Sequence, residues 1–104
     1  FLFENIEFKT LDTVLDINIV KDCQVYINTS IEHIEQKYID IIFNSLKKGT
    51  MFAIQSNNYY SVADHINCSD SLDDFKSKTL CSEILYCDKL KFKEYDRYMI
   101  IGIV

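Results

Sequence analysis

Two apolar segments of this sequence each end in polar side chains that could do chemistry. Cys23–Asn28 is followed by Thr29, Ser30 and the pair Glu32–His33, and Thr50–Gln55 is followed by Ser56, Asn57 and Asn58. Histidine titrates near neutral pH, so His33 is a candidate general base for a hydroxyl substrate. The other candidates for hydrogen bonds to a substrate are carboxylate and amide side chains: Glu32, Gln55, Asn57 and Asn58.

The same residues also have purely structural readings. Thr29 and Glu32 have the spacing of a capping box, in which Glu32 would bond backbone amides at a helix start. His33 could be a helix N-terminal histidine without a ligand. Asparagine is a common turn residue, so Asn57 and Asn58 could simply form a turn. A structural role is also the expectation for His65. Both readings stay open on the sequence alone.

The elements that would position these side chains follow from hydrophobic periodicity. Asp12–Val20 is ambiguous between a short helix and a turn. The apolar run Cys23–Asn28 predicts a central strand buried on both faces. The predicted strands are Phe3–Leu11, Cys23–Asn28, Thr50–Gln55, Ser82–Phe92 and Arg97–Val104.

Two helices are predicted between these strands. The first carries one apolar stripe and should stop at Gly49 as its C′ residue. The second starts at Ser71, where Asp74 three positions later resembles a capping box, with Leu72 and Phe75 facing inward. The stripe of the first helix consists of Ile34, Tyr38, Ile41, Ile42 and Leu46.

Strands that alternate with helices predict an α/β fold in one domain, residues 1–104. In open α/β sheets ligands bind outside the carboxyl ends of the strands. Both polar groups follow such ends, so they should share one rim of the sheet and line a ligand crevice there.

Composition narrows the partners and the compartment. The 104 residues carry a formal charge of −5 with only sparse lysines, which argues against nucleic acid, and no apolar run reaches membrane-spanning length. The four cysteines and two histidines show no zinc spacing, so no metal site is predicted. We therefore expect the cysteines to be reduced and the protein to be cytoplasmic. The sequence does not exclude a disulfide between Cys81 and Cys87.

The segment D-C-Q-V-Y-I-N-T-S-I-E-H-I, followed by L-K-K-G-T-M-F-A-I, resembles the C-terminal half of a class I S-adenosylmethionine-dependent methyltransferase. These stretches are similar to that family's fourth strand, its "E-H" segment and the "L-K-P-G-G" turn into the fifth strand, with Lys48 and Thr50 replacing the usual proline and second glycine. The last two strands resemble its sixth and seventh. The resemblance implies a partial Rossmann-like methyltransferase sheet, mostly parallel with an antiparallel C-terminal hairpin.

The resemblance also implies roles for individual residues. Asp12 would meet the adenine of S-adenosylmethionine, and Asn28 and Thr29 would lie near the cofactor. His33 would be catalytic, with a small molecule as the methyl acceptor. The family's glycine-rich loop and the acidic residue after its second strand are absent, so the cofactor half is missing. The chain begins at Phe1 rather than Met, which we take as a sign of a processed product or a fragment.

Three expectations and two alternatives follow. The strand at 50–55 should lie between a parallel 23–28 strand and an antiparallel 97–104 strand, with 82–92 at the edge. The chain alone should bind S-adenosylmethionine weakly or not at all. The unpaired edge of Cys23–Asn28 should cause self-association, which a lysine in place of Tyr26 should reduce, unless Phe3–Leu11 pairs with that edge.

The alternatives are a non-catalytic interaction module and a DNA adenine methyltransferase, although N-N-Y-Y lacks the prolines of the latter's D/N-P-P-Y signature.

Overall fold

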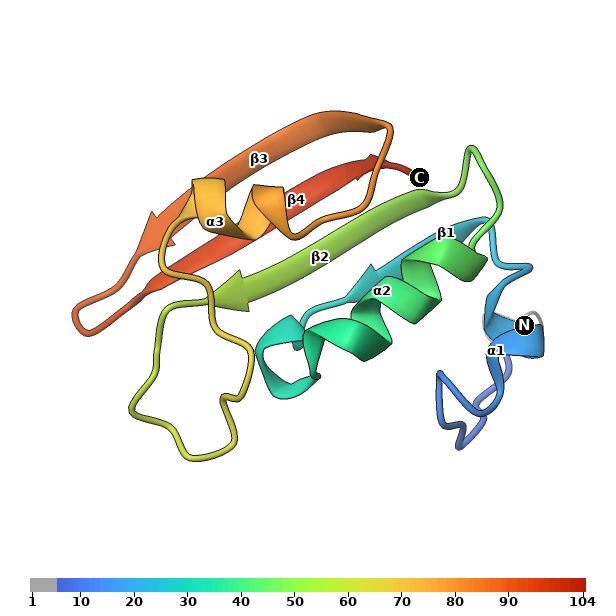
Figure 1. Cartoon of the computed structure of the whole chain (residues 1–104), viewed down its shortest axis with the longest axis horizontal. Coiled ribbons are helices and arrows are strands. Elements are labelled where there is room, and N and C mark those ends of the chain that lie inside the picture. The colour runs from blue at the N-terminus through green and yellow to red at the C-terminus, as the bar shows by residue number, and fades with distance from the viewer. Residues whose placement is uncertain (1–5) are drawn as a thin grey trace.

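The computed structural model describes residues 6–104 and contains a four-stranded sheet with short helices (Figure 1). The first half of the chain holds α1 (Ile17–Val20), β1 (Val25–Asn28), the 3₁₀ turn η1 (Ile31–His33) and α2 (Gln36–Ser45). The second half holds β2 (Met51–Asn57), α3 (Leu72–Ser77), β3 (Glu83–Lys91) and β4 (Asp96–Ile103).

The strand order in the sheet is β1-β2-β4-β3. β1 and β2 are parallel neighbours connected through α2, and β4 is antiparallel to both β2 and β3. The predicted arrangement of these four strands is therefore confirmed, and so is the C-terminal hairpin. The prediction of a mostly parallel sheet is wrong, because one of the three neighbouring pairs is parallel.

One face of the sheet is covered by both α2 and α3, which lie on the same side in Figure 1. Phe43 of α2 meets Phe52 of β2 edge-on with ring centroids 5.0 Å apart, and Phe75 of α3 lies 6.2 Å from Tyr98 of β4. The backbone of Gly102 lies against Phe52, so that a Cβ added at Gly102 would be 2.8 Å from the ring. This face therefore forms the hydrophobic core.

The opposite face of the sheet carries an apolar surface that the described residues leave open. The β1 side chains Val25 and Ile27 are 51% and 66% exposed, and Met51, the register partner of Val25, is 41% exposed. Ile101 and Ile103 of β4 occupy the same face and are half-buried. The periodicity of these strands is that of segments covered on both sides, although only one side is covered in the described chain.

The N-terminal region differs from its prediction. Of the proposed strand Phe3–Leu11, residues 6–11 form no strand, and residues 3–5 lie outside the described part of the chain. Phe8 is 88% exposed, so the alternating apolar residues here lack the packing that would order a strand. β1 consequently pairs only with β2 among the described strands. It is an edge strand exposed on one face, and the predicted central position is wrong.

The first predicted helix is present, and its buried face matches the predicted stripe in part. α2 buries Ile39, Ile42 and Phe43, whereas Tyr38 and Ile41 are 36% and 42% exposed. Ile42 and Leu46 of the predicted stripe are buried as expected, so the stripe was misassigned at Tyr38 and Ile41.

The predicted end of this helix is also wrong. Gly49 is not the C′ residue, because the helix ends at Ser45 and Leu46 is already extended. Gly49 instead supplies a φ of 91° in the turn before β2, where glycine avoids Cβ strain.

The predicted start of the second helix is confirmed. The Ser71 hydroxyl accepts a hydrogen bond of 3.0 Å from the Asp74 backbone N–H, and Phe75 is buried. β2 continues through Asn57, two residues past its predicted end. All four cysteines are free in the structure. None of the helices in the described region is long and apolar enough to cross a membrane.

Candidate functional site

A buried carboxylate marks the rim where β1 and β2 end. Glu32 lies in η1, directly after β1, and is 4% exposed. Its Oε1 accepts a hydrogen bond of 3.0 Å from Asn57 Nδ2 at the end of β2, and Arg97 Nη1 lies 3.5 Å from the same oxygen. Glu32 thus joins the ends of the two parallel strands. The two polar groups singled out in the sequence do meet at one rim.

Arg97 connects this rim to the start of β4. Its Nε donates to Gln55 Oε1 at 3.0 Å, and its Nη2 donates to the Thr29 carbonyl at 2.6 Å. With the ion pair to Glu32, one guanidinium contacts residues after β1 and within β2. Arginine suits this task because its planar fork presents several donors at fixed angles.

The loop between β2 and α3 brings a second histidine to the rim. The Asn67 backbone N–H donates to the Glu32 carbonyl at 3.0 Å, and its side-chain amide donates to the Ile34 carbonyl at 2.9 Å. These bonds fix the loop against η1. His65 consequently packs edge-on against His33, with ring centroids 4.7 Å apart.

Each imidazole is oriented by a backbone carbonyl. His33 Nδ1 lies 3.1 Å from the Asp64 carbonyl oxygen, and His65 Nδ1 lies 2.7 Å from the Tyr59 carbonyl oxygen. A carbonyl oxygen only accepts, so each Nδ1 must carry the proton in these bonds. The lone pair of each neutral ring is then on Nε2, where it can accept a proton or bind a ligand.

The second oxygen of the Glu32 carboxylate lacks a partner. Oε2 is buried and makes no hydrogen bond to any residue of the described chain. One potential ligand atom from each of Glu32, His33 and His65 lies within 4.8 Å of the others. A buried unsatisfied carboxylate oxygen is costly, so this arrangement requires an explanation.

The remaining predicted residues around the rim have local roles. The predicted Thr29–Glu32 capping box does not form: Ser30 precedes η1 without a side-chain cap, and the Glu32 carboxylate turns to Asn57 and Arg97 instead. Asn58 Oδ1 accepts the Asp96 backbone N–H at 2.7 Å, which joins β2 to β4. Asn28 binds locally, to the Ser30 N–H and the Tyr26 hydroxyl.

Asp12 lies in a separate hollow of about 300 Å³, which it lines together with Val14, Leu15, Ile34 and Tyr38. Its Oδ1 accepts the backbone N–H groups of Leu15 and Val14, and these hydrogen bonds lower the pKa of the Asp12 carboxyl. The structure does not bring Asp12 into contact with Asn28 or Thr29.

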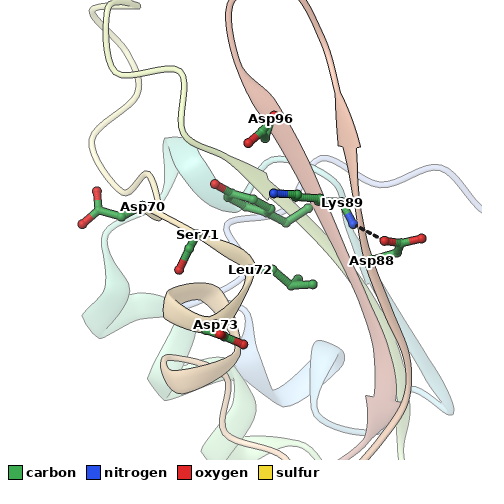
Figure 2. Close-up of a pocket in the computed structure, with 8 residues that line it drawn as sticks. Asp70, Ser71, Leu72, Asp73, Asp88, Lys89 and Asp96 are labelled. Atoms are coloured by element: carbon green, nitrogen blue, oxygen red, sulfur yellow. Dashed lines mark hydrogen bonds between the residues drawn. The ribbon is translucent and has the colours of Figure 1, made fainter.

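A further hollow of about 360 Å³ lies between the β3–β4 hairpin and the start of α3 (Figure 2). Figure 2 shows the carboxylates of Asp70, Asp73, Asp88 and Asp96 around it, with Lys89 among them. Beside this hollow Asp70 accepts a hydrogen bond from the Tyr60 hydroxyl, which raises the pKa of Tyr60 to about 12. The hollow contains neither histidine, so we place the candidate site at the rim. Its lining consists of Asp70, Ser71, Leu72, Asp73, Asp88, Lys89, Asp96 and Tyr98.

Sequence reasoning missed two contributors to the rim. Arg97 was treated only as the start of a strand, although it is the only arginine of the sequence and therefore an available signal. His65 received a structural reading, because nothing in its spacing indicates that the loop folds back onto His33.

Comparison with known proteins adds no family assignment. No protein-family model matches the chain, and no curated protein or solved structure matches it either. The functional argument therefore depends on the geometry of the chain itself.

Proposed function

We propose that this chain is the C-terminal half of a class I S-adenosylmethionine-dependent methyltransferase domain, whose parent protein transfers a methyl group to a small-molecule acceptor. The observation that carries the proposal is the strand order β1-β2-β4-β3. If these strands correspond to the family's fourth to seventh, the order is fourth, fifth, seventh, sixth. That is the order implied by the resemblance, with the last strand antiparallel inside the sheet.

The uncovered face of the sheet supports this proposal. Val25, Ile27 and Met51 expose apolar surface on the side that α2 and α3 do not cover. β1 also has one edge without a partner strand in the described chain. A Rossmann-like sheet has helices on both faces and further strands beside its fourth, so the missing half of the domain would bury both surfaces.

Within the proposed enzyme the rim would hold the acceptor. His33 is exposed, and its Nε2 lone pair can accept a proton from a hydroxyl group, which suits a general base. Gln55, Asn57 and Asn58 would be the polar residues nearest the acceptor. Asp12 would contribute the adenine side of the cofactor site from its own hollow, and Asn28 and Thr29 would contact the cofactor separately, at the end of β1. Free thiols favour a cytoplasmic location for the parent protein.

Cofactor binding tests the proposal. Calorimetry with the 104-residue chain should detect S-adenosylmethionine binding that is weaker than micromolar or absent, because the chain lacks a glycine-rich loop. The coding sequence upstream of Phe1 should encode that loop, and the chain expressed together with it should bind micromolar S-adenosylmethionine. An upstream sequence without such a loop, or a longer protein that binds no cofactor, would refute the proposal.

A non-catalytic interaction module is the second candidate, and the open apolar face favours it. Large exposed apolar patches commonly mark protein interaction sites. Under this alternative the face would bind another protein and the rim would be structural. The longer protein would then fail to bind S-adenosylmethionine, while Ile27→Glu would weaken capture of the partner without altering the rim.

A further inference from the structure

We propose that Glu32, His33 and His65 form a binding site for a divalent transition-metal ion, with zinc as the ion that the donor set favours. Two imidazoles and one carboxylate are an established zinc ligand set, which leaves a fourth position open. The three side chains already place one ligand atom each within 4.8 Å of the others. Bound ligand atoms would be about 3.4 Å apart for zinc bonds of about 2.1 Å, so the rings need only a small inward movement.

The orientation of the two rings is the strongest support for the site. Metal-binding histidines usually donate their other ring N–H to a carbonyl or carboxylate, which fixes the tautomer and the direction of the ring. His33 and His65 both do this, through the carbonyls of Asp64 and Tyr59. With Nδ1 bonded to a carbonyl, each ring would bind the ion through Nε2, and both rings are anchored by backbone rather than by mobile side chains.

The buried carboxylate supplies the independent observation. Glu32 is 4% exposed, its Oε1 is held by Asn57 and Arg97, and its Oε2 has no hydrogen-bond partner within residues 6–104. A cation at Oε2 would compensate the burial of this oxygen. Asn57 and Arg97 would then be the supporting residues that fix the ligand, as outer partners do in metal sites.

Sequence spacing could not reveal this site. Glu32 and His33 are adjacent, but His65 follows only after α2, β2 and most of a loop. The loop is positioned by Asn67, which bonds to the backbone of η1 and to the chain that follows it. The third ligand therefore depends on tertiary structure alone.

Ion binding has one consequence for catalysis. This consequence rests on the proposed function, whereas the metal site itself does not. A metal ion on Nε2 occupies the lone pair, so His33 cannot act as a general base while the ion is bound. The open fourth position would instead receive an oxygen atom of the acceptor and lower the pKa of its hydroxyl.

The 104-residue chain itself provides the test, because His33 and His65 are its only histidines. Their ring signals in NMR spectra report directly on the site during titration with zinc chloride. Both rings should shift together and saturate at one equivalent of Zn²⁺, while Ca²⁺ at the same concentration should leave them unchanged, since Ca²⁺ prefers oxygen ligands. Movement of only one ring, of neither ring, or an equal response to Ca²⁺ would overturn the proposal.

Variants separate this site from the free thiols. His33→Gln and His65→Gln should each weaken zinc binding at least tenfold in calorimetry. The controls Asp64→Asn and Cys68→Ser should leave it unchanged, because Asp64 contributes only its backbone carbonyl and Cys68 is not among the three ligands. Unchanged zinc affinity in both histidine variants, or loss of binding in Cys68→Ser, would refute the assignment. A longer protein that binds zinc but does not bind S-adenosylmethionine would refute the proposed function and leave the metal site intact.

Discussion

Replacement of Arg97 by methionine should destabilise the fold more than any ordinary surface substitution. The guanidinium makes contacts to Gln55, to the Thr29 carbonyl and to Glu32, and the Glu32 side chain is only 5% exposed. Methionine keeps most of the side-chain volume but leaves the buried carboxylate without its cation. The perturbation therefore tests the ion pair and its hydrogen bonds rather than packing.

The magnitude follows from the burial of the two partners. Removing one partner of a buried ion pair costs about 3–5 kcal/mol. The Arg97 side chain is 28% exposed and its Nη1 lies at the long distance of 3.5 Å from Glu32, which argues for the lower end of that range. We therefore expect Arg97→Met to reduce the free energy of unfolding by about 3 kcal/mol, a large part of the typical stability of a domain.

Urea unfolding measures this loss, with Lys93→Met as the matched control. Lys93 is an exposed cation in the turn between β3 and β4, so its replacement should change stability by less than about 0.5 kcal/mol. The double variant Glu32→Gln/Arg97→Met should be more stable than the sum of the single effects implies, by about 1–2 kcal/mol. Equal losses for Arg97→Met and the control, or strict additivity in the double variant, would refute the reasoning.

Three further outcomes are expected. Asp70 raises the pKa of Tyr60 from 10.0 to about 12, so between these pH values the folded state keeps a proton that the unfolded state loses. The free energy of unfolding should therefore fall as the pH rises from about 10 to about 12. Urea unfolding of Tyr60→Phe that shows the same fall would contradict this. Gly102→Ala should lower the free energy of unfolding by about 1–3 kcal/mol, because a Cβ at this position would lie 2.4 Å from the Glu83 backbone oxygen and 2.8 Å from the Phe52 ring. An unchanged free energy of unfolding would argue against these close approaches. Self-association through the β1 edge should appear in sedimentation at rising protein concentration, and it should decrease in Ile27→Lys. The sequence alone suggested lysine at Tyr26, but Tyr26 is only 7% exposed, so that substitution would unfold the chain instead. A wild-type chain that stays monomeric would refute the edge argument.

The sheet was largely predictable from the sequence because its strands carry strong local signals. Apolar runs bounded by polar groups located β2, β3 and β4 to within a few residues, and Ser71 with Asp74 identified the start of α3. The inner face of α2 was not predictable in the same way. Ile39 and Phe43 are no more apolar than Ile41, so only the position of the sheet decides which of them is buried.

The site was predictable in part. The polar groups after the two parallel strands meet because strands that run in the same direction end at the same rim. The pairing of His33 with His65 could not be foreseen, since it depends on how the loop is held by Asn67. Arg97 could have been noticed as the only arginine of the sequence, but its ion pair with Glu32, which is far away in the chain, could not be foreseen.

The position of β4 has a consequence for how the chain folds. β4 is the last of the four strands in the sequence, yet it lies between β2 and β3 and joins positions as distant as Met51 and Ile103. During synthesis, β2 can pair with β1 but must wait for β4 before its second edge is closed. Non-local pairing of this kind slows folding and prolongs the time in which strand edges are exposed. The nascent chain should therefore depend on chaperones until Asp96–Ile103 has emerged, whatever its final function.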